Sequence, residues 1–423
     1  MPFETISVVG LGYIGLPTAA VFASRKKKVI GVDVNQQAID IINRGEIHIV
    51  EPDLDMLVHA AVTEGFLRAT TKAEPADAFL IAVPTPFKGD HEPDLSYIES
   101  ASKTIAPVLK KGDLVILEST SPVGATEQMA AWLAEARPDL TFPQSHGEAS
   151  DIRVAHCPER VLPGQVLREL VLNDRVIGGM TAKCSEAAVK LYKIFVQGEC
   201  IITDARTAEM CKLTENSFRD VNIAFANELS IICDKLDINV WELIRLANRH
   251  PRVNILQPGP GVGGHCIAVD PWFIVSSTPG EAKLIRVARD VNDGKPHWVN
   301  DKVKLAVAEF LQENPEKTAL DVTIACFGLA FKPDIDDLRE SPALAITQEI
   351  AATHPGCVLA VEPNIAELPS KLVGGKLVLK ELEQALAESD IFVLLVDHKV
   401  FKNTPVAALR GRKVVDTRGV WVS

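Results

Sequence analysis

Short apolar runs alternate with amphipathic stretches over the first half of the chain. The runs "ISVVGLG", "KVIGVDVN", "ADAFLIAVPTP", "DLVILEST" and "RVAHCPE" are apolar at nearly every position. Strands of this kind, separated by helical patterns, are typical of a parallel sheet with helices on both faces. The pattern therefore predicts a doubly wound α/β fold that ends near residue 195.

The middle of the chain is helical instead. From Asp204 to about Leu236 there is no Gly or Pro, and apolar residues recur at helical spacing. A further helical pattern follows a glycine-rich segment, and we expect it to break at Gly294–Pro296. A helical middle of this kind commonly links domains or forms the core of a dimer.

The last third repeats the opening theme. "VTIACFGLAFK", "CVLAVEPN" and "ESDIFVLLVDH" correspond to the first, second and third strands of the opening fold, but the glycine triplet is missing. The sequence predicts an α/β protein with two Rossmann-like doubly wound domains, joined by a helical central domain with a long helix. The expected bounds are 1–195, 196–312 and 313–423.

Composition narrows the class of protein. The net charge of -12 over 423 residues argues against a nucleic-acid partner, because such binding rests on Lys and Arg. Apolar stretches fall well short of the roughly 20 residues that cross a bilayer. The first strand begins at residue 6, which leaves no room for a signal peptide, so we expect a cytoplasmic protein without a membrane partner.

The eight cysteines show no CxxC pair and no metal-like spacing, so neither a metal site nor disulfides are expected. Seven read as small buried hydrophobes. Cys266 is the exception because it ends the glycine-rich stretch "GPGVGGHC". A thiol on a tight, exposed loop suggests a nucleophile.

The first strand and helix enclose a dinucleotide-binding motif. Gly10, Gly12 and Gly15 permit the turn and the close approach of a pyrophosphate to the helix N-terminus, and Tyr13 and Ile14 lie between them. Asp33 ends the second strand, where a carboxylate accepts from a ribose 2′-hydroxyl and repels a 2′-phosphate. This motif predicts NAD as the cofactor rather than NADP.

Other polar residues carry a weaker signal. Thr85, Thr120 and Thr126 follow later strands at the carboxyl edge of the sheet, where ligands bind, although ordinary turns explain them equally well. Lys212, Asn216 and Arg219 lie at i, i+4 and i+7 on one face of the long helix. Spacing alone is also typical of a solvated polar stripe.

Five motifs together resemble the UDP-glucose/GDP-mannose dehydrogenase family. They occur in the family's order and span essentially the whole chain: "GLGYIGLP", "CPERVLPG", "AEMCKLTENSFR", "GPGVGGHCIAVDP" and "FGLAFKPDIDDLRESPA". The resemblance implies oxidation of a nucleotide-sugar C6 alcohol to a carboxylate with two NAD.

The resemblance also implies roles for five catalytic residues. Cys266 adds to the aldehyde, giving a thiohemiacetal and then a thioester. Lys212 stabilises the developing alkoxide, with Asn216 as its partner. Glu159 activates water for hydrolysis, and Asp270 positions water or a lysine. A turn or capping role remains the alternative for Asp270.

The substrate side of the site follows from the same resemblance. Arg339 matches a residue that reaches NAD. Arg160 and Val161 replace an aromatic residue and a leucine, and Pro163 replaces a second glutamate, which suggests a pocket reshaped for an N-acetylated sugar. The expected substrate-binding residues are Arg160, Val161, Lys212, Asn216, Arg219, His250, Arg252, Gly263, Phe331, Lys332 and Arg418.

These features favour a UDP-N-acetylhexosamine as substrate. The resemblance implies UDP-N-acetylmannosamine first, oxidised to UDP-N-acetylmannosaminuronate for a bacterial surface polysaccharide such as enterobacterial common antigen. UDP-N-acetylglucosamine and GDP-mannose are the near alternatives, and a two-electron hydroxyacid dehydrogenase or a silent nucleotide-sugar sensor are more distant ones. Because Arg252 can reach a neighbouring subunit's site in this family, a homodimer is also expected.

Overall fold

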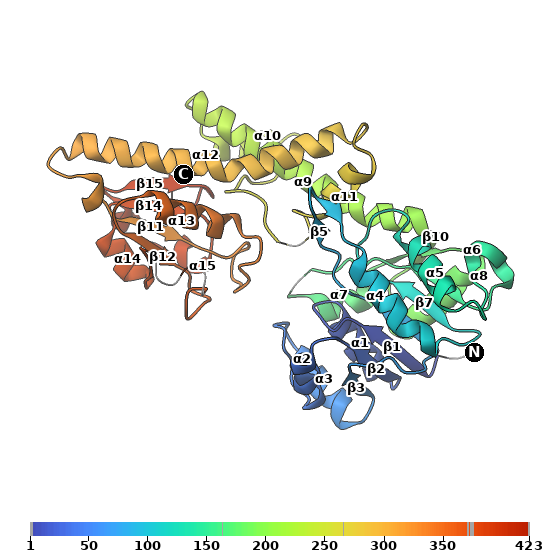
Figure 1. The fold of residues 1–423 in the computed structure, drawn as a ribbon. Helices are drawn as coiled ribbons and strands as arrows, with labels where there is room; N and C mark the ends of the chain where they lie inside the picture. Colours follow the sequence, from blue (N-terminus) through green and yellow to red (C-terminus); the bar gives the residue numbers. More distant parts are fainter. Residues whose placement is uncertain (1–2, 163, 265, 370–371, 373–375, 422–423) are drawn as a thin grey trace. The chain divides into compact units, whose positions relative to one another are not determined.

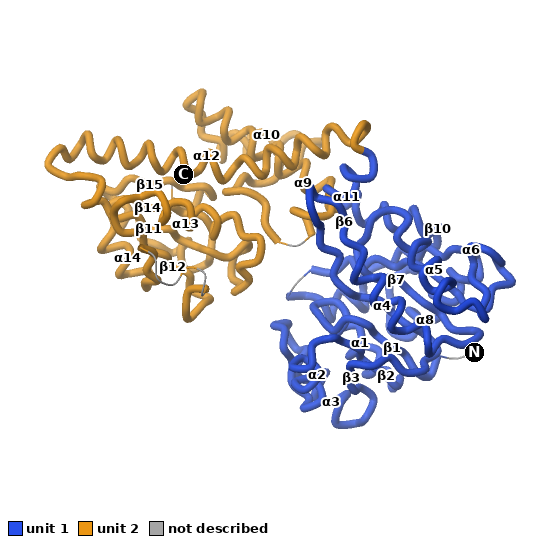
Figure 2. Tube along the Cα trace, viewed as in Figure 1, with its two compact units in different colours: residues 1–215, 272–278 blue, residues 216–271, 279–423 orange. Residues whose placement is uncertain are grey.

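The computed structural model describes residues 3–162, 164–264, 266–369, 372 and 376–421 (Figure 1). Contacts divide the chain into two compact units (Figure 2). The first unit comprises residues 1–215 and 272–278, and the second comprises residues 216–271 and 279–423. The three predicted domain limits stay a prediction.

The first unit is built on an eight-stranded sheet of order β10-β9-β8-β7-β4-β1-β2-β3. Its strands are β1 (Thr5–Val9), β2 (Lys28–Val32), β3 (Leu67–Thr70), β4 (Ala78–Ile81), β7 (Leu114–Leu117), β8 (Arg153–His156), β9 (Arg175–Gly179) and β10 (Cys200–Asp204). Six neighbouring strands, in the spatial order β3-β2-β1-β4-β7-β8, follow the Rossmann order and are parallel. β9 runs antiparallel to β8, so this sheet is not wholly parallel as the sequence predicted.

Helices cover both faces of this sheet. Along β4, Ala78 and Leu80 join the core formed with α1, α2, α3, α7 and α8, whereas Phe79 and Ile81 join the core formed with α4 and α5. This alternation is what burial on both faces requires. The helices are α1 (Gly15–Ser24), α2 (Gln36–Asn43), α3 (Leu54–Thr63), α4 (Ser96–Ile105), α5 (Ala125–Ala136), α6 (Pro143–His146), α7 (Val166–Leu172) and α8 (Ala182–Tyr192).

A short hairpin in the first unit packs against the helix that follows the glycine-rich loop. The hairpin consists of β5 (Phe87–Lys88) and β6 (Glu92–Pro93), and the helix is α11 (Asp270–Ser277). The His91 ring stacks on Trp272 with ring centroids 4.1 Å apart.

The second unit holds a five-stranded parallel sheet of order β13-β12-β11-β14-β15. The long helix α9 (Ala205–Lys235) begins in the first unit and continues into the second, where it packs on α12 (Lys283–Glu313) through buried hydrogen bonds. The remaining elements are α10 (Val240–Ala247), β11 (Ile324–Phe327), α13 (Pro342–Thr353), β12 (Val358–Val361), β13 (Leu377–Leu379), α14 (Leu382–Glu388), β14 (Ile391–Leu394), α15 (Lys399–Lys402), α16 (Val406–Leu409) and β15 (Lys413–Asp416). Single 3-10 turns occupy Ala106–Val108, Gly147–Ala149 and Ala319–Asp321.

The predicted fold class is confirmed, with two Rossmann-like sheets and a helical region between them in sequence. The predicted helix break at Gly294–Pro296 is wrong, because α12 continues through Pro296. Buried residues on both sides of it, including Lys295 and Val299, hold the helix in place, and tertiary packing overrides the local preference. The first sheet also extends past the predicted end near residue 195, to β10. The sequence did not predict this strand because Ile201 and Ile202 are exposed at the sheet edge and give no buried-strand pattern.

No helix in the described part of the chain has both the length and the apolar character of a membrane span. All eight cysteines are free, but Cys200 and Cys211 are half-buried and Cys357 is exposed. The expectation of seven buried thiols is therefore wrong, and exposure alone does not single out Cys266.

Candidate active site

The glycine turn after β1 is closely packed on one side and open on the other. Gly10 has a φ of 91°, in the left-handed region that favours glycine. A Cβ at Gly15 would lie 1.7 Å from the Gly10 carbonyl oxygen, whereas a Cβ at Gly12 would have nothing within 4 Å. Tyr13 and Ile14 are half-buried at the start of α1.

Asp33 is held beside this turn by two backbone groups. Its Oδ2 accepts from the Leu11 N–H (2.8 Å) and its Oδ1 from the Asn35 N–H (2.9 Å). The side chain is half-buried, so it can also meet a ribose. The open surface at Gly12 and the acid beside it fit a dinucleotide.

The three threonines differ in what surrounds them. The Thr85 hydroxyl is buried and has no hydrogen-bond partner among the described residues, which fits a ligand contact. Thr120 is half-buried after β7. The Thr126 hydroxyl donates to Glu209 Oε1 (2.6 Å) inside the protein, so a ligand contact by this side chain stays only a prediction.

Glu159 lies in a buried charged cluster behind the carboxyl ends of β7 and β8. Its Oε2 is 2.8 Å from Nη1 of Arg175, and its Oε1 accepts from the Arg160 N–H (2.7 Å). Tyr192 donates to Glu118 Oε1 (2.6 Å) in the same cluster. Burial, which Arg175 opposes and Glu159 reinforces, raises the pKa of Glu118 to about 7.

This cluster sets how Glu159 can act. Arg175 is 3% exposed and Glu159 is 7% exposed, so the ion pair is shielded from water. The Arg175 guanidinium and the Arg160 N–H hold the Glu159 carboxylate in a fixed position.

The predicted residues that follow Glu159 in sequence make contacts within the first unit. The Arg160 guanidinium pairs with Glu215 Oε1 at 2.7 Å, and Val161 packs against the core of the first unit. Pro163 lies outside the described residues. Lys212 is half-buried on α9, in the first unit.

The glycine-rich loop lies in the second unit, against the residues that follow β11 and β15. A Cβ at Gly259 would lie 2.8 Å from Arg418 Nη1, and one at Gly263 would lie 2.9 Å from Phe331 Cβ. These positions leave no room for side chains. The structure thus brings Gly263, Phe331 and Arg418 together with the loop that leads to Cys266.

Cys266 is exposed, one turn before α11. Its carbonyl accepts from the Asp270 N–H (2.9 Å), which ties the thiol's position to the start of that helix. His265 lies outside the described residues.

Asp270 and Asn216 form a buried pair in the second unit. Asn216 Nδ2 donates to Asp270 Oδ2 at 2.5 Å, and both side chains are almost fully buried. Their distance in sequence gave no sign of this contact. Arg219, one turn beyond Asn216 on α9, is exposed.

The other predicted substrate and cofactor residues of the second unit lie near its surface. His250 and Arg252 are exposed, and Lys332 is half-buried. Arg339 is exposed and pairs with Asp337 Oδ2 (2.6 Å).

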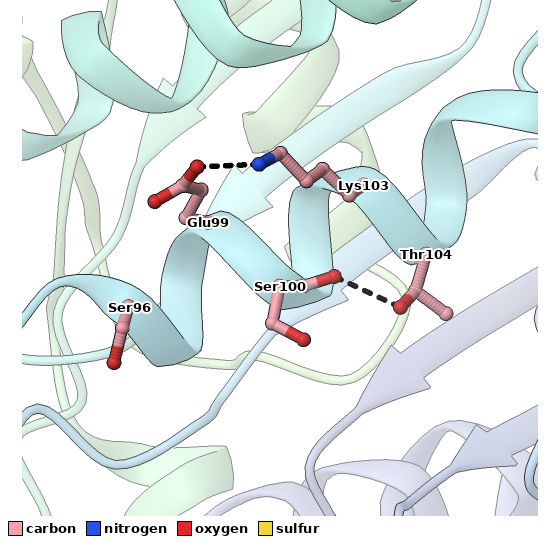
Figure 3. A pocket seen from close by; sticks show the side chains of 5 residues that line it. All are labelled: Ser96, Glu99, Ser100, Lys103 and Thr104. Carbon is pink, nitrogen blue, oxygen red and sulfur yellow. Dashed lines mark hydrogen bonds and ion pairs between the residues drawn. The ribbon is translucent and has the colours of Figure 1, made fainter.

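The pocket in Figure 3 is a different feature. It lies on α4 and is lined by Ser96, Glu99, Ser100, Lys103 and Thr104. Lys103 pairs with Glu99 (2.5 Å) and Thr104 donates to the Ser100 carbonyl (2.8 Å). Lys103 and Thr104 are thus bonded to residues of their own helix, and none of the predicted site residues lines the pocket.

Several residues near the site were missed by sequence reasoning. Glu209 caps α5 by accepting from the Gly124 and Thr126 N–H groups (2.6 and 2.8 Å). Arg175 and Asn227 each hold a group next to a predicted catalytic segment. Asn227 continues the polar face of Asn216 at helical spacing, and that spacing was the available signal.

Comparison with known proteins identifies the family. Residues 4–196, 206–294 and 325–423 match, in that order, the NAD binding domain, the central domain and the UDP binding domain of the UDP-glucose/GDP-mannose dehydrogenase family. The chain belongs to this family. The resemblance inferred from the motifs is confirmed. As a UDP-glucose/GDP-mannose dehydrogenase family member, the chain is an NAD-dependent oxidoreductase.

Individual members of the family are also similar over their full length. UDP-N-acetyl-D-mannosamine dehydrogenase of Yersinia pestis is 71% identical over 421 residues, with 100% of both chains covered. NDP-N-acetyl-D-galactosaminuronic acid dehydrogenase of Ralstonia nicotianae is 68% identical over 419 residues, covering 99% of this chain and 96% of that one. The solved structure of UDP-D-ManNAc dehydrogenase from Pyrococcus horikoshii matches with a TM-score of 0.87 and 40% identity, covering 98% of this chain and 96% of the other.

Proposed function

We propose that this protein oxidises the C6 alcohol of UDP-N-acetyl-D-mannosamine to the carboxylate of UDP-N-acetyl-D-mannosaminuronate, in two steps. The observation that carries the proposal is the exposed Cys266 on its glycine-rich loop, against Phe331 and Arg418. A thiol is not needed to oxidise an alcohol to an aldehyde. It is needed to take the aldehyde further.

The chemistry at Cys266 explains this need. When bound, NAD accepts one hydride at each oxidation. The Cys266 thiolate adds to the C6 aldehyde, forming a C–S bond and a thiohemiacetal whose oxygen takes a proton. The second oxidation leaves a thioester, and attack by water breaks the C–S bond to give the carboxylate and the free thiol.

Other residues have supporting roles in this proposal. Gly10, Gly12, Gly15 and Asp33 hold the NAD. Lys212 stabilises the alkoxide that develops at each oxidation, because a cation directed at developing charge lowers the barrier.

The two buried carboxylates have separate roles. Asp270, anchored by Asn216, positions the attacking water near the thioester. Glu159, paired with Arg175, takes the proton from that water.

The choice of sugar rests on the relatives and on Arg160, Val161 and Pro163. The relative at 71% identity is named for N-acetylmannosamine, but the one at 68% is named for an N-acetylgalactosaminuronic acid. A UDP-N-acetylhexosamine whose sugar is an epimer of N-acetylmannosamine is therefore the second candidate substrate.

One experiment tests the activity and the sugar together. The purified protein is incubated with NAD and UDP-N-acetylmannosamine, UDP-N-acetylglucosamine, UDP-N-acetylgalactosamine, UDP-glucose or GDP-mannose, and NADH absorbance is followed. We expect the fastest turnover with UDP-N-acetylmannosamine and two NADH per sugar. One NADH per sugar would rule out the two-step reaction.

The Cys266→Ala variant tests the nucleophile. It should bind NAD with unchanged affinity, because the NAD-binding residues lie elsewhere, and should form no uronate. Uronate formation at the normal rate by this variant would contradict the assignment.

A homodimer is part of the proposal. Phe218, Phe225 and Ile232 recur every seven residues on α9 and are 68%, 51% and 45% exposed. Leu284 on α12 is also 68% exposed. Apolar stripes of this kind are typical of an interface with a second helix pair. Light scattering should give a dimer for the wild type and a monomer for Phe225→Glu.

The setting of the reaction follows from its chemistry. NAD, a nucleotide sugar and a reduced catalytic thiol are all available in the cytoplasm, which is the proposed location. The product is a building block for a bacterial surface polysaccharide such as enterobacterial common antigen.

A further inference from the structure

A buried chain of hydrogen bonds in the second unit ends at the first glycine of the loop. The Gly259 N–H donates to Asn227 Oδ1 (2.9 Å), and Asn227 Nδ2 donates to Asn292 Oδ1 (2.9 Å). Asn292 Nδ2 donates to Asp220 Oδ1 (2.8 Å), which also accepts from Arg289 Nη1 (2.6 Å). All four side chains are at most 1% exposed.

The chemistry of the far end decides which way each amide points. Arg289 can only donate, so its partner Asp220 accepts. Asn292 must then turn its NH₂ group to Asp220 and its oxygen to Asn227. Asn227 in turn must donate to Asn292, which leaves its oxygen for the Gly259 N–H. This series of hydrogen bonds therefore fixes Asn227 Oδ1 as an acceptor for the loop.

The loop beyond Gly259 has little freedom to absorb a shift. A Cβ at Gly261 would lie 2.9 Å from Pro342 Cβ, and one at Gly263 would lie 2.5 Å from the Glu340 carbonyl oxygen. At its far end the Cys266 carbonyl accepts from the Asp270 N–H. Gly259 and Cys266 are thus each held by a backbone hydrogen bond, and Gly261 and Gly263 are closely packed between them.

We propose that Asn227 is a positioning residue for the Cys266 thiol, because it anchors the first glycine of the loop through the chain that starts at Arg289. This inference rests on the proposed function, since only a reaction through Cys266 makes the rate depend on where the loop lies. Misplacing a reacting group by about 1 Å can cost about a hundredfold in rate.

The test compares Asn227→Ala with Asn300→Ala. Asn300 is a matched control because it is 2% exposed on α12 and its side-chain atoms bond to none of the described residues. Hydrogen exchange of the peptide 257–264 reports the Gly259 amide directly. Turnover and the affinity for NAD are measured on the same samples.

For Asn227→Ala we expect the Gly259 amide to exchange at least about tenfold faster, because its acceptor is lost. The kcat should fall about tenfold to a hundredfold while the affinity for NAD stays within about twofold. Asn300→Ala should leave both exchange and kcat within about twofold, whatever its melting temperature. If Asn227→Ala does not fold, Asn292→Ala tests the same chain and should shift both readouts in the same direction.

The contrary outcomes are distinct. Unchanged exchange in Asn227→Ala would overturn the anchor, and faster exchange with unchanged kcat would overturn its role in placing the thiol. An equal loss of kcat in Asn300→Ala would assign the effect to general packing and overturn the proposal as well. If the wild type formed no NADH from any nucleotide sugar, the proposed function would fail, while the exchange data would still judge the anchor.

Discussion

The first and second Rossmann-like sheets can be compared at the turn that follows the first strand of each, β1 and β11. Gly10 follows β1 with a φ of 91°, and Gly328 follows β11 with a φ of 93°. Each N–H donates over 2.8 Å to the last residue of the adjacent strand, Val32 in one sheet and Val361 in the other. The two backbones make the same turn.

An acid from the end of the second strand closes each turn in the same way. Leu11 N–H donates to Asp33 Oδ2 and Leu329 N–H donates to Glu362 Oε2, both at 2.8 Å. This correspondence extends the internal repeat that the apolar runs predict.

The difference lies in what else the acid meets. Asp33 is half-buried, whereas Glu362 is 4% exposed and lies 3.0 Å from Nε2 of the fully buried His398. The Ala330 N–H also binds Glu362 (3.1 Å), where the first turn has the open Gly12. The same local geometry therefore leaves the acid accessible in one sheet and encloses it in the other, and side chains distant in sequence make the difference.

The largest expected effect tests the close packing of the first turn. In Gly15→Ala the new Cβ would overlap the Gly10 carbonyl oxygen, so the turn and the start of α1 must move. We expect the affinity for NAD, measured by calorimetry, to fall by about a hundredfold or more, because the helix N-terminus no longer meets the pyrophosphate. Gly12→Ala is the control for folding, since its Cβ meets no protein atom and the melting temperature should not change. Wild-type NAD affinity in Gly15→Ala would contradict this account of the turn.

The next effect concerns the two acids as ligand contacts. Asp33→Asn should lower the affinity for NAD by about tenfold, because a hydrogen bond to a charged group is lost, and should lower the preference for NAD over NADP. Glu362→Gln is the matched change in the second sheet and should leave both unchanged. Equal effects of the two substitutions on NAD titrations would remove the functional difference between the turns.

A smaller effect is expected on stability, and here the substitution in the second sheet should have the larger effect. Glu362→Gln should lower the free energy of unfolding by about 1–3 kcal/mol, because the buried carboxylate accepts from two backbone N–H groups and meets His398. Asp33→Asn should cost less, since water reaches its side chain. Urea unfolding curves of both variants compare them, and a larger loss in Asp33→Asn would argue against the closed role of Glu362.

The smallest effect is the pH dependence of that stability difference. Burial raises the pKa of Glu362, but the hydrogen bonds from His398 and the Leu329 N–H outweigh it and hold the pKa below its ordinary value. A depressed folded pKa contributes stability that is present above the unfolded pKa of about 4.3 and is lost as the pH falls through the folded pKa. The difference between wild type and Glu362→Gln should therefore be constant near neutral pH and shrink below about pH 4. A difference that grows on acidification would have the wrong sign.

The elements that the sequence predicted are those whose signal is local. Fully apolar strands such as β4 and β7 are buried at every position, and α9 follows its helical spacing closely. The exposed edge strand β10 and the unbroken α12 were not predicted, because an edge has no buried pattern and Pro296 lies in a helix held by its neighbours.

By itself, the sequence determined the apolar core strands of the two sheets, the glycine turn with Asp33 and the unusual setting of Cys266, because strand burial, turn geometry and close glycine spacing are properties of a few consecutive residues. Only the tertiary structure decided the pairing of Asn216 with Asp270, of Glu159 with Arg175, and of Asn227 with Gly259. Each of those contacts joins polar groups far apart in the chain. Their free energy arises only when folding removes water from both partners at once, so no local pattern of residues records it.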